Sequence, residues 1–356
     1  MKKLKTLILY FLTKLFYRHK YIFDPQKPRI LIVSTTGLGD SLWATPTFFA
    51  IKEKYPNCFL AVLTSIIGKE VFTNNSLVDE IFILDKPFLR FIISLIKNLR
   101  KEKFQVIIIY HSSQRITLPI CSLIGASMII GTKKNNKGLD KLLTKKIDRK
   151  KEHEIKHRFR LIKEINISKE NYPIYFNPFF SSKQKTHSFL SPFIHKIKIV
   201  IHPGAANSYK CWNKDLFIRL VNLLSQDANV HIFITGYGKE KAIIEEIKDK
   251  ANKKTTLIYN WPLHDLGALF SQMDLIISND TGPAHLTIGV EGKLLVLFSP
   301  TDPLLFGPYC YAKAKVLSNK PCCNPCLKRK CLDPFCWYQI SPEKVYKSAL
   351  ELLKKN

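Results

Sequence analysis

The sequence has no apolar run long enough to cross a bilayer. Near its start, the stretch without charged residues from Thr6 to Thr13 is far shorter than the ~20 residues that a membrane-spanning helix needs. No small-residue cleavage site follows this stretch, so it does not have the pattern of a secretory signal. We therefore expect the chain to stay in the cytoplasm.

Acidic residues are scarce. The 356-residue chain has 28 Asp and Glu against 56 Lys and Arg, which gives a formal net charge of +28. Half of the excess lies in two stretches of +7 each: residues 1–29 have eight basic residues and one acid, and residues 133–158 have eleven and four. Such an excess predicts an anionic partner, namely nucleic acid, an anionic membrane or a phosphorylated substrate. A lysine-rich coding bias that only keeps the surface soluble is the alternative.

The N-terminal extension, residues 1–28, contains an amphipathic pattern. On a helix over residues 1–23, the leucine, isoleucine and phenylalanine side chains fall on one side and are surrounded by lysine and arginine. This pattern is typical of a helix that lies in a membrane interface. A helix that packs on its own domain would have the same pattern, and the sequence does not separate the two.

The dinucleotide-binding fingerprint lacks its third glycine. After the apolar run "RILIV", the segment "STTGLGDS" places Gly37 and Gly39 in a turn, but Leu42 stands where the third glycine would be. The missing glycine argues against an NAD site. Asp40 follows at the start of a predicted helix. It is either a capping or first-turn acid or a carboxylate that takes the proton from an attacking substrate hydroxyl.

Apolar runs alternate with helical patterns along the whole chain, and this predicts an α/β fold. The strand candidates are "RILIVS", "FLAVLT", "IFIL", "FQVIIIY" and "SMIIG" in the first half, and "IKIVIH", "VHIFIT", "TTLIY", "DLIIS" and "KLLVLFS" in the second. We expect two Rossmann-like domains, residues 29–190 and 191–356, with parallel sheets facing across a cleft. Ligands of such sheets bind beyond the carboxyl ends of the strands.

Two further loops follow predicted strands. The segment "HPGAANSYKCW" places Lys210 just before a helical pattern, where a cation and backbone N–H groups could bind a phosphate. In "SNDTGPAHL", Asp280 or Thr281 can cap the next helix, which has Pro283 in its first turn and carries His285. The start of this helix would be a second anion site.

These three loops, in this order and spacing, resemble those of glycosyltransferase family 9, the ADP-heptose:lipopolysaccharide heptosyltransferases. The resemblance runs from "ILIVSTTGLGDSLWATPTFFAIKEKYP" through "HPGAANSYKCW" to "SNDTGPAHLTIGVEGKLLVLFSPTDPLLFGPY". The resemblance implies a GT-B fold and an inverting glycosyltransferase that needs no metal and no cofactor. Its donor would be ADP-heptose, and its product would belong to lipopolysaccharide biosynthesis.

The resemblance also implies roles for individual residues. Asp40 matches the general base, with Gly37 and Gly39 shaping its turn, and Lys210, two residues before Trp212, matches the cation that neutralises the departing diphosphate. The expected contacts with the donor are Asp280, Thr281, Gly282 and His285 for the diphosphate and sugar, and Glu240 for the ribose. We expect Arg115, in "HSSQR", to contact the acceptor.

The same resemblance gives the basic surface a partner. The acceptor would be an anionic, lipid-linked saccharide, so we expect a peripheral protein on the inner face of the cytoplasmic membrane that binds no nucleic acid. Two alternatives remain: the same fold and mechanism with another nucleotide-sugar donor, or a basic, cysteine-rich nucleic-acid-binding protein. The nucleic-acid alternative does not explain Asp40, Lys210 and Asp280 at successive strand ends.

Two further motifs compete with this interpretation. "HEIKH", His153–His157, has the H-E-x-x-H spacing of zinc proteases, but dense basic flanks would repel zinc, and we expect a helix with a solvated face. A cysteine-rich loop at residues 322–336 contains Cys322, Cys323, Cys326, Cys331 and Cys336. These cysteines could form a structural metal cluster or remain thiols, whereas a reducing cytoplasm disfavours disulfides.

Overall fold

The computed structural model describes residues 13, 21–84, 91–111, 115–251, 255–321, 323, 326, 331 and 335–354. It divides into two compact units, Met1–Ile174 and Tyr175–Asn356. The amphipathic pattern of residues 1–23 falls almost entirely outside the described residues, so its two interpretations stay predictions. No helix among the described residues is long and apolar enough to span a membrane.

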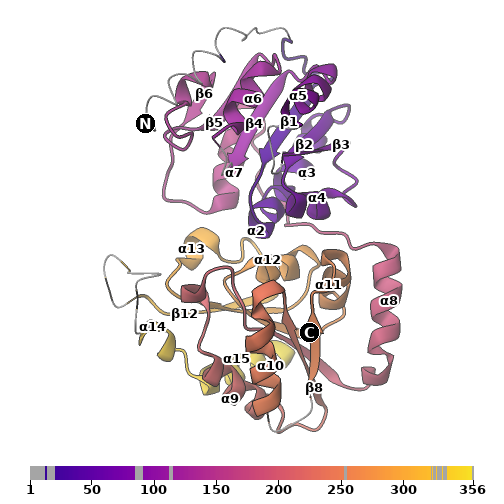
Figure 1. The fold of residues 1–356 in the computed structure, drawn as a ribbon, viewed down its shortest axis with the longest axis vertical. Helices are drawn as coiled ribbons and strands as arrows, with labels where there is room; N and C mark the ends of the chain where they lie inside the picture. The colour runs from indigo at the N-terminus through magenta and orange to yellow at the C-terminus, as the bar shows by residue number, and fades with distance from the viewer. Residues whose placement is uncertain are drawn as a thin grey trace. The chain divides into compact units, whose positions relative to one another are not determined.

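The N-terminal unit contains a six-stranded parallel sheet (Figure 1). Its strands are β1 (Arg29–Ser34), β2 (Phe59–Thr64), β3 (Glu80–Ile83), β4 (Val106–His111), β5 (Met128–Thr132) and β6 (Lys145–Ile147). They lie in the order β3-β2-β1-β4-β5-β6, which is the Rossmann order with its switch point between β1 and β4.

Helices connect and cover these strands. They are α2 (Leu38–Leu42), α3 (Thr45–Lys54), α4 (Ile66–Phe72), α5 (Ile92–Lys101), α6 (Thr117–Leu123) and α7 (Glu154–Ile162). Helices α5 and α6 share a hydrophobic core with β1 and β4. Helix α7 packs against α3 and contacts β4 and β5. This contact brings α7 close to the switch point of the sheet.

The C-terminal unit repeats the same architecture. Its strands are β7 (Ile197–His202), β8 (Val230–Gly236), β9 (Thr256–Tyr259), β10 (Leu275–Asn279), β11 (Leu294–Phe298) and β12 (Ala314–Ser318). The sheet order β12-β11-β10-β7-β8-β9 is again the Rossmann order, with the switch point between β7 and β10. The predicted fold class, α/β with two parallel sheets, is therefore confirmed.

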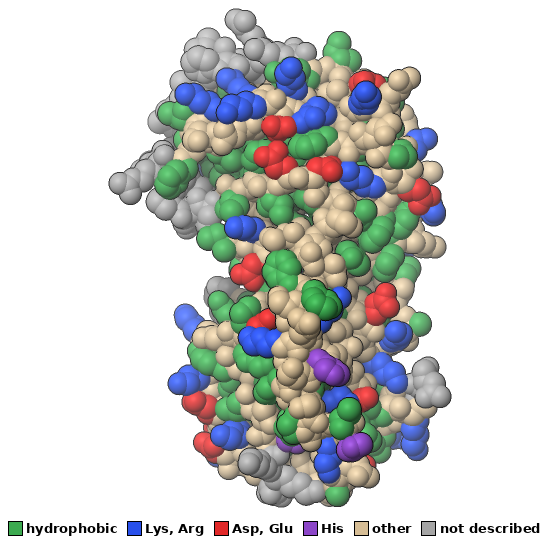
Figure 2. All heavy atoms as spheres, turned by 90° about the vertical axis from the view of Figure 1, so that its right-hand side faces the viewer, with side chains coloured by type: hydrophobic (Ala, Val, Ile, Leu, Met, Phe, Trp, Pro, Cys, Tyr) green, Lys and Arg blue, Asp and Glu red, His purple; other side chains and the backbone are tan. Residues whose placement is uncertain are grey.

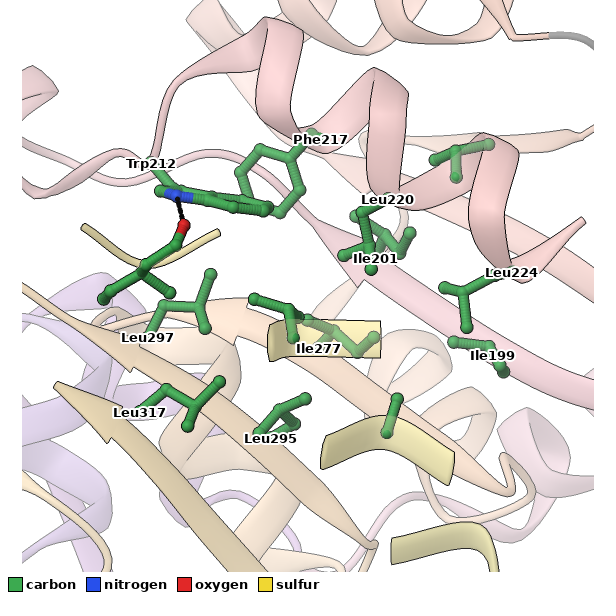
Figure 3. Close-up of a cluster of buried hydrophobic side chains, with 14 of the residues drawn as sticks. Ile199, Ile201, Trp212, Phe217, Leu220, Leu224, Ile277, Leu295, Leu297 and Leu317 are labelled. Carbon is green, nitrogen blue, oxygen red and sulfur yellow. Dashed lines mark hydrogen bonds between the residues drawn. The ribbon is translucent and has the colours of Figure 1, made fainter. Parts of the chain in front are cut away.

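The helices of this unit are α8 (Phe180–Leu190), α9 (Lys214–Leu224), α10 (Lys241–Lys250), α11 (Leu263–Phe270), α12 (Gly282–Gly289), α13 (Pro303–Phe306), α14 (Phe335–Tyr338) and α15 (Pro342–Lys354). Side chains of α9, α10 and α15 pack on the sheet in one buried cluster. Figure 3 shows Phe217 and Leu220 of α9 above Ile201, Ile277 and Leu295 of the strands. This core fixes the ends of β7 and β10, from which the site loops start.

The structure differs from the expected organisation in two respects. The units separate between Ile174 and Tyr175, before the expected boundary at 190/191, because α8 packs against α11 of the C-terminal unit. Strands β6 and β12 were not predicted. They form the sheet edges beside β5 and β11, and β6 falls within the basic stretch 133–158.

Lysine and arginine side chains are spread over the visible face of both units (Figure 2). Acidic side chains lie between them, and many of the basic residues are paired, such as Lys52 with Asp79 and Lys214 with Glu246. The basic excess is therefore distributed over the surface of the described residues as well as concentrated in the two stretches.

Candidate active site

Asp40 lies at the switch point of the N-terminal sheet. It is in the first turn of α2, directly after β1. Gly37 is the N-cap of this short helix and makes no side-chain capping bond, so Asp40 is a first-turn acid and not the cap. Gly37 has φ −78°, which any residue can adopt. No atom would meet a Cβ there within 4 Å, so the turn leaves open space beside its backbone.

Both carboxylate oxygens of Asp40 already have partners. The Thr36 hydroxyl donates to Oδ2 at 2.8 Å, and the Arg158 guanidinium donates to Oδ1 at 3.2 Å. Burial raises the pKa of Asp40, but Arg158, His111 and the Thr36 hydrogen bond lower it by more, so the pKa lies below its usual value. The side chain is 25% exposed. Asp40 is thus an ionised carboxylate that a substrate can still reach.

The contact between Arg158 and Asp40 was not predicted. Arg158 directly follows the "HEIKH" segment, on the helix that was expected to have a solvated face. That expectation is wrong for this face of α7: Arg158 is 1% exposed, and His157 is buried as well. The guanidinium carbon of Arg158 lies 5.5 Å from the ring centroid of Trp43 and 5.9 Å from that of Tyr110. A basic residue on a helix with apolar neighbours at helical spacing was the signal that could have indicated burial.

The two histidines of this segment have structural partners. His153 is the N-cap of α7 and accepts a hydrogen bond from the Ile155 N–H. His157 is hydrogen-bonded to the Thr132 hydroxyl at 2.7 Å. Burial is the main cause that lowers the pKa of His157 to about 4, so the ring is neutral at physiological pH. His153 thus caps α7, and His157 connects α7 to Thr132 of β5.

Lys210 and Asp280 meet at the switch point of the C-terminal sheet. Lys210 ends the short 3₁₀ turn Ser208–Lys210, and Asp280 follows β10 directly. The Lys210 Nζ donates to Asp280 Oδ2 at 2.6 Å, and the Thr301 hydroxyl donates to the same oxygen at 2.6 Å. Asp280 is 4% exposed and Lys210 is 22% exposed. The Lys210 ammonium is therefore partly accessible, whereas the carboxylate that pairs with it is buried.

The neighbouring residues hold the Lys210 loop in place. The Asn279 side chain accepts a hydrogen bond from the Trp212 N–H and donates to the carbonyl of Pro203. The Trp212 indole is buried and donates to the carbonyl of Ile340 at 3.0 Å (Figure 3). In return, the Trp337 indole donates to the carbonyl of Tyr209. The position of Lys210 is thus fixed from both sides of its turn.

Helix α12 begins beside this ion pair. Thr281 occupies the N-cap position, one of the two residues expected there, but its side chain makes no capping hydrogen bond. Pro283 is in the first turn, as predicted. Thr281 and Gly282 are half-buried, and His285 is buried. The first turn is therefore accessible next to Lys210, whereas the His285 ring packs inside.

Glu240 ends the turn after β8. Its Oε2 accepts a hydrogen bond from the Tyr237 N–H at 2.8 Å and lies 3.8 Å from the His202 ring nitrogen Nε2. A Cβ placed on Gly204 would lie 2.0 Å from Glu240 Oε1. Glycine at position 204 thus makes room for this carboxylate at the end of β7, the strand that neighbours β8.

Arg115 and the cysteines complete the set of predicted residues. Arg115 is half-buried and follows β4. Cys336 is part of the hydrophobic core, and Cys322 lies outside the described residues. Within the part of the chain that the structure describes, no three His, Cys, Asp or Glu side chains come together to hold a metal ion.

Two Rossmann-order sheets, with charged side chains at both switch points, define the class of two-domain α/β enzymes with the GT-B fold. The chain belongs to glycosyltransferase family 9 (heptosyltransferase), whose family model matches residues 92–335. It is therefore a glycosyltransferase.

Similar proteins agree with this assignment. The chain is 25% identical to lipooligosaccharide heptosyltransferase 2 of Campylobacter jejuni over 92% of its length and 99% of the relative's. A solved family 9 glycosyltransferase of Veillonella parvula superposes with a TM-score of 0.83 at 21% identity, covering 95% of this chain and all of that one. The Escherichia coli heptosyltransferase WaaC, solved with ADP, has a TM-score of 0.72 at 15% identity, covering 91% and 99%. These structural likenesses concern the fold.

Proposed function

We propose that this enzyme transfers a heptose from ADP-heptose to a lipopolysaccharide-core or similar envelope saccharide, with inversion at the anomeric carbon. The observation that carries the proposal is the similarity, over 92% of the chain, to a lipooligosaccharide heptosyltransferase. The ADP in the structure of WaaC supports the choice of nucleotide. The charged groups at the two switch points support the chemistry.

In the proposed reaction, Asp40 acts as the general base. The acceptor hydroxyl loses its proton to the Asp40 carboxylate while its oxygen forms a bond to the anomeric carbon of the heptose. The bond between that carbon and the diphosphate oxygen breaks, and ADP leaves with the bonding electrons. A single displacement of this kind inverts the configuration. The ionised state and partial exposure of Asp40 support this role.

Lys210 would stabilise the departing diphosphate. A lysine ammonium has three N–H donors, and in this structure one of them is directed to Asp280. The other donors, together with the first turn of α12, can bind phosphate oxygens as negative charge develops. Because these groups supply the positive charge, we propose that the reaction needs no metal ion. Thr281, Gly282 and His285 would complete the donor site.

We propose that Glu240 binds the ribose of the donor, and Gly204→Ala tests this assignment. The added methyl would displace the Glu240 carboxylate, which a Cβ would approach to 2.0 Å. We expect calorimetric ADP affinity to fall about tenfold, since a charged hydrogen-bond acceptor is moved, with little change in the midpoint of thermal unfolding.

Glu240→Gln and the double variant provide the control for this prediction. If Gly204→Ala acts through Glu240, the two effects are not additive. A Gly204→Ala protein with wild-type ADP affinity would rule out the assigned role of Glu240.

We further propose that the acceptor is an anionic, lipid-linked saccharide and that Arg115 contacts it. We also propose that the enzyme works at the inner face of the cytoplasmic membrane. The net charge of +28 supports an anionic partner and an anionic surface. Vesicle sedimentation at rising salt would check the membrane part: binding to anionic vesicles that salt weakens is expected, and equal binding to neutral vesicles would contradict it.

Calorimetric titration of the purified protein with ADP, UDP, GDP and NAD⁺ in EDTA tests the donor assignment. We expect selective binding of ADP. Selective binding of UDP or GDP would keep the family and the mechanism but replace the donor. No binding of any nucleotide would contradict the proposed function.

A further inference from the structure

The buried guanidinium of Arg158 lies between two carboxylates. One of its NH groups donates to Asp40 Oδ1 at 3.2 Å, and the other donates to Glu154 Oε2 at 3.1 Å and to the Glu154 carbonyl at 3.0 Å. Arg158 is 1% exposed, whereas Asp40 and Glu154 are 25% and 15% exposed. One buried cation thus has two anionic partners, of which only Asp40 has a proposed part in the chemistry.

We propose that Arg158 and Glu154 are positioning residues for Asp40: Arg158 fixes the orientation of its carboxylate, and Glu154 keeps the guanidinium paired when Asp40 takes up a proton. The proposal rests on the function of Asp40 as the general base. It assigns Glu154 a role that requires no contact with either substrate.

The physical reason lies in the charge balance. When Asp40 accepts the acceptor's proton it becomes neutral, and Arg158 loses one of its two anionic partners. A buried guanidinium without an anionic partner is strongly unfavourable, so an Asp40–Arg158 pair standing alone would resist the proton transfer. Glu154 stays ionised and hydrogen-bonded to Arg158, so the buried cation remains compensated throughout the step.

The surrounding charges fit this arrangement. Besides Arg158, Thr36 before α2 donates a hydrogen bond to Asp40, and His111 at the end of β4 and Glu154 on α7 interact with it electrostatically. Glu154 also accepts hydrogen bonds from Arg149, which is more exposed than Arg158. The pKa of Glu154 is lowered overall. Burial and the negative charge of Asp40 raise this pKa, but the positive charges of Arg158 and Arg149 lower it by more. Asp40 and Glu154 are therefore close enough for the charge of Asp40 to affect the protonation of Glu154, and both are hydrogen-bonded to the same cation.

Glu154→Gln tests the proposal, with Glu152→Gln as the matched control. Glutamine keeps an oxygen that can accept from Arg158 but removes the charge. Glu152 lies on the same segment and pairs with Arg160 and His157, not with Arg158. The first readout is a ¹³C NMR titration of the Asp40 carboxyl in the substrate-free protein, assigned by its loss in Asp40→Asn.

With Glu154→Gln, we expect the Asp40 titration midpoint to fall, because one negative charge is gone and Arg158 pairs with Asp40 alone. We also expect kcat to fall by about tenfold with the KM of the donor unchanged, since a weaker base removes the proton less well. Glu152→Gln should leave the Asp40 midpoint in place. Arg158→Lys keeps the positive charge but loses the planar guanidinium that donates to Asp40 and Glu154 at once. We therefore expect Arg158→Lys to lower kcat while the titration midpoint of Asp40 stays close to its wild-type value.

An Asp40 midpoint that is the same in Glu154→Gln and in the wild type would overturn the proposal, whatever the activity. The titration needs no turnover, so it separates this inference from the proposed function. A shifted midpoint in a protein whose turnover does not depend on Asp40 would refute Asp40 as the base and leave the shared pairing standing.

Discussion

Asp40→Asn is expected to lower kcat by about 10²- to 10⁴-fold, the usual contribution of a general base, and to leave the calorimetric affinity for ADP unchanged. Asparagine keeps an oxygen that can accept from Arg158 but cannot take up the acceptor's proton. The fold should persist, because Arg158 remains paired with Glu154. The measurement is steady-state turnover at saturating donor, beside ADP titration of the same preparation.

Asp215→Asn is the matched control for Asp40→Asn. Asp215 is an exposed first-turn acid of α9, so the same chemical change there should leave kcat and the unfolding midpoint near their wild-type values. Near-normal turnover in a folded Asp40→Asn protein would show that Asp40 is not the base, and its role would be that of a first-turn acid stabilised by the helix dipole.

Lys210→Ala is expected to lower kcat by about 10²- to 10³-fold, as for removal of one group that stabilises transition-state charge, and also to weaken ADP binding. The loss in both quantities follows because the ammonium would contact the diphosphate before and during its departure. Turnover and calorimetric ADP titration measure the two effects.

Lys210→Ala is also expected to lower the stability of the fold. Lys210→Ala leaves Asp280, which is 4% exposed, with only the Thr301 hydroxyl as a partner, and an uncompensated buried carboxylate destabilises the fold. The double variant Lys210→Ala/Asp280→Asn restores the charge balance. We expect it to recover the unfolding midpoint but not turnover. Recovery of turnover would mean that Lys210 only neutralises Asp280. Lys214 is an exposed lysine at the start of α9. Lys214→Ala should change neither turnover nor the affinity for ADP.

Most strands could be predicted because a parallel sheet buries both faces of its strands, which makes them continuous apolar runs. The run "RILIVS" is β1, Arg29–Ser34, residue for residue. Strand β6 is the opposite case: "KKI" has two exposed lysines and only three residues, so it has no apolar run to detect. It forms because the edge of β5 offers free backbone hydrogen-bonding groups.

The sequence also allowed the prediction that the loops of Lys210 and Asp280 lie at the same edge of the sheet. The carboxyl ends of parallel strands meet at one edge, and β7 and β10 are neighbours in which Ser278 is aligned with His202. The ion pair itself was not predictable, since it depends on the conformation of a loop that Trp212 and Asn279 hold in place.

Arg158 shows what the sequence could not reveal. It lies 118 residues from Asp40, on a helix whose dense charges suggested solvent exposure. Only the packing of α7 against β4 and β5 turns this arginine inward. A motif with zinc-protease spacing drew attention to the two histidines, whereas the residue next to them contacts the proposed base.

Heptosyl transfer is tested most directly by incubating the purified protein with ADP-heptose and a lipid-linked core saccharide in EDTA, while following ADP release and the anomeric configuration of the product by NMR. We predict ADP release that requires the acceptor, persists in EDTA and gives a product of inverted configuration. The proposed reaction would be contradicted if the protein transferred sugar from another nucleotide-sugar but not from ADP-heptose. A product of retained configuration would contradict it as well.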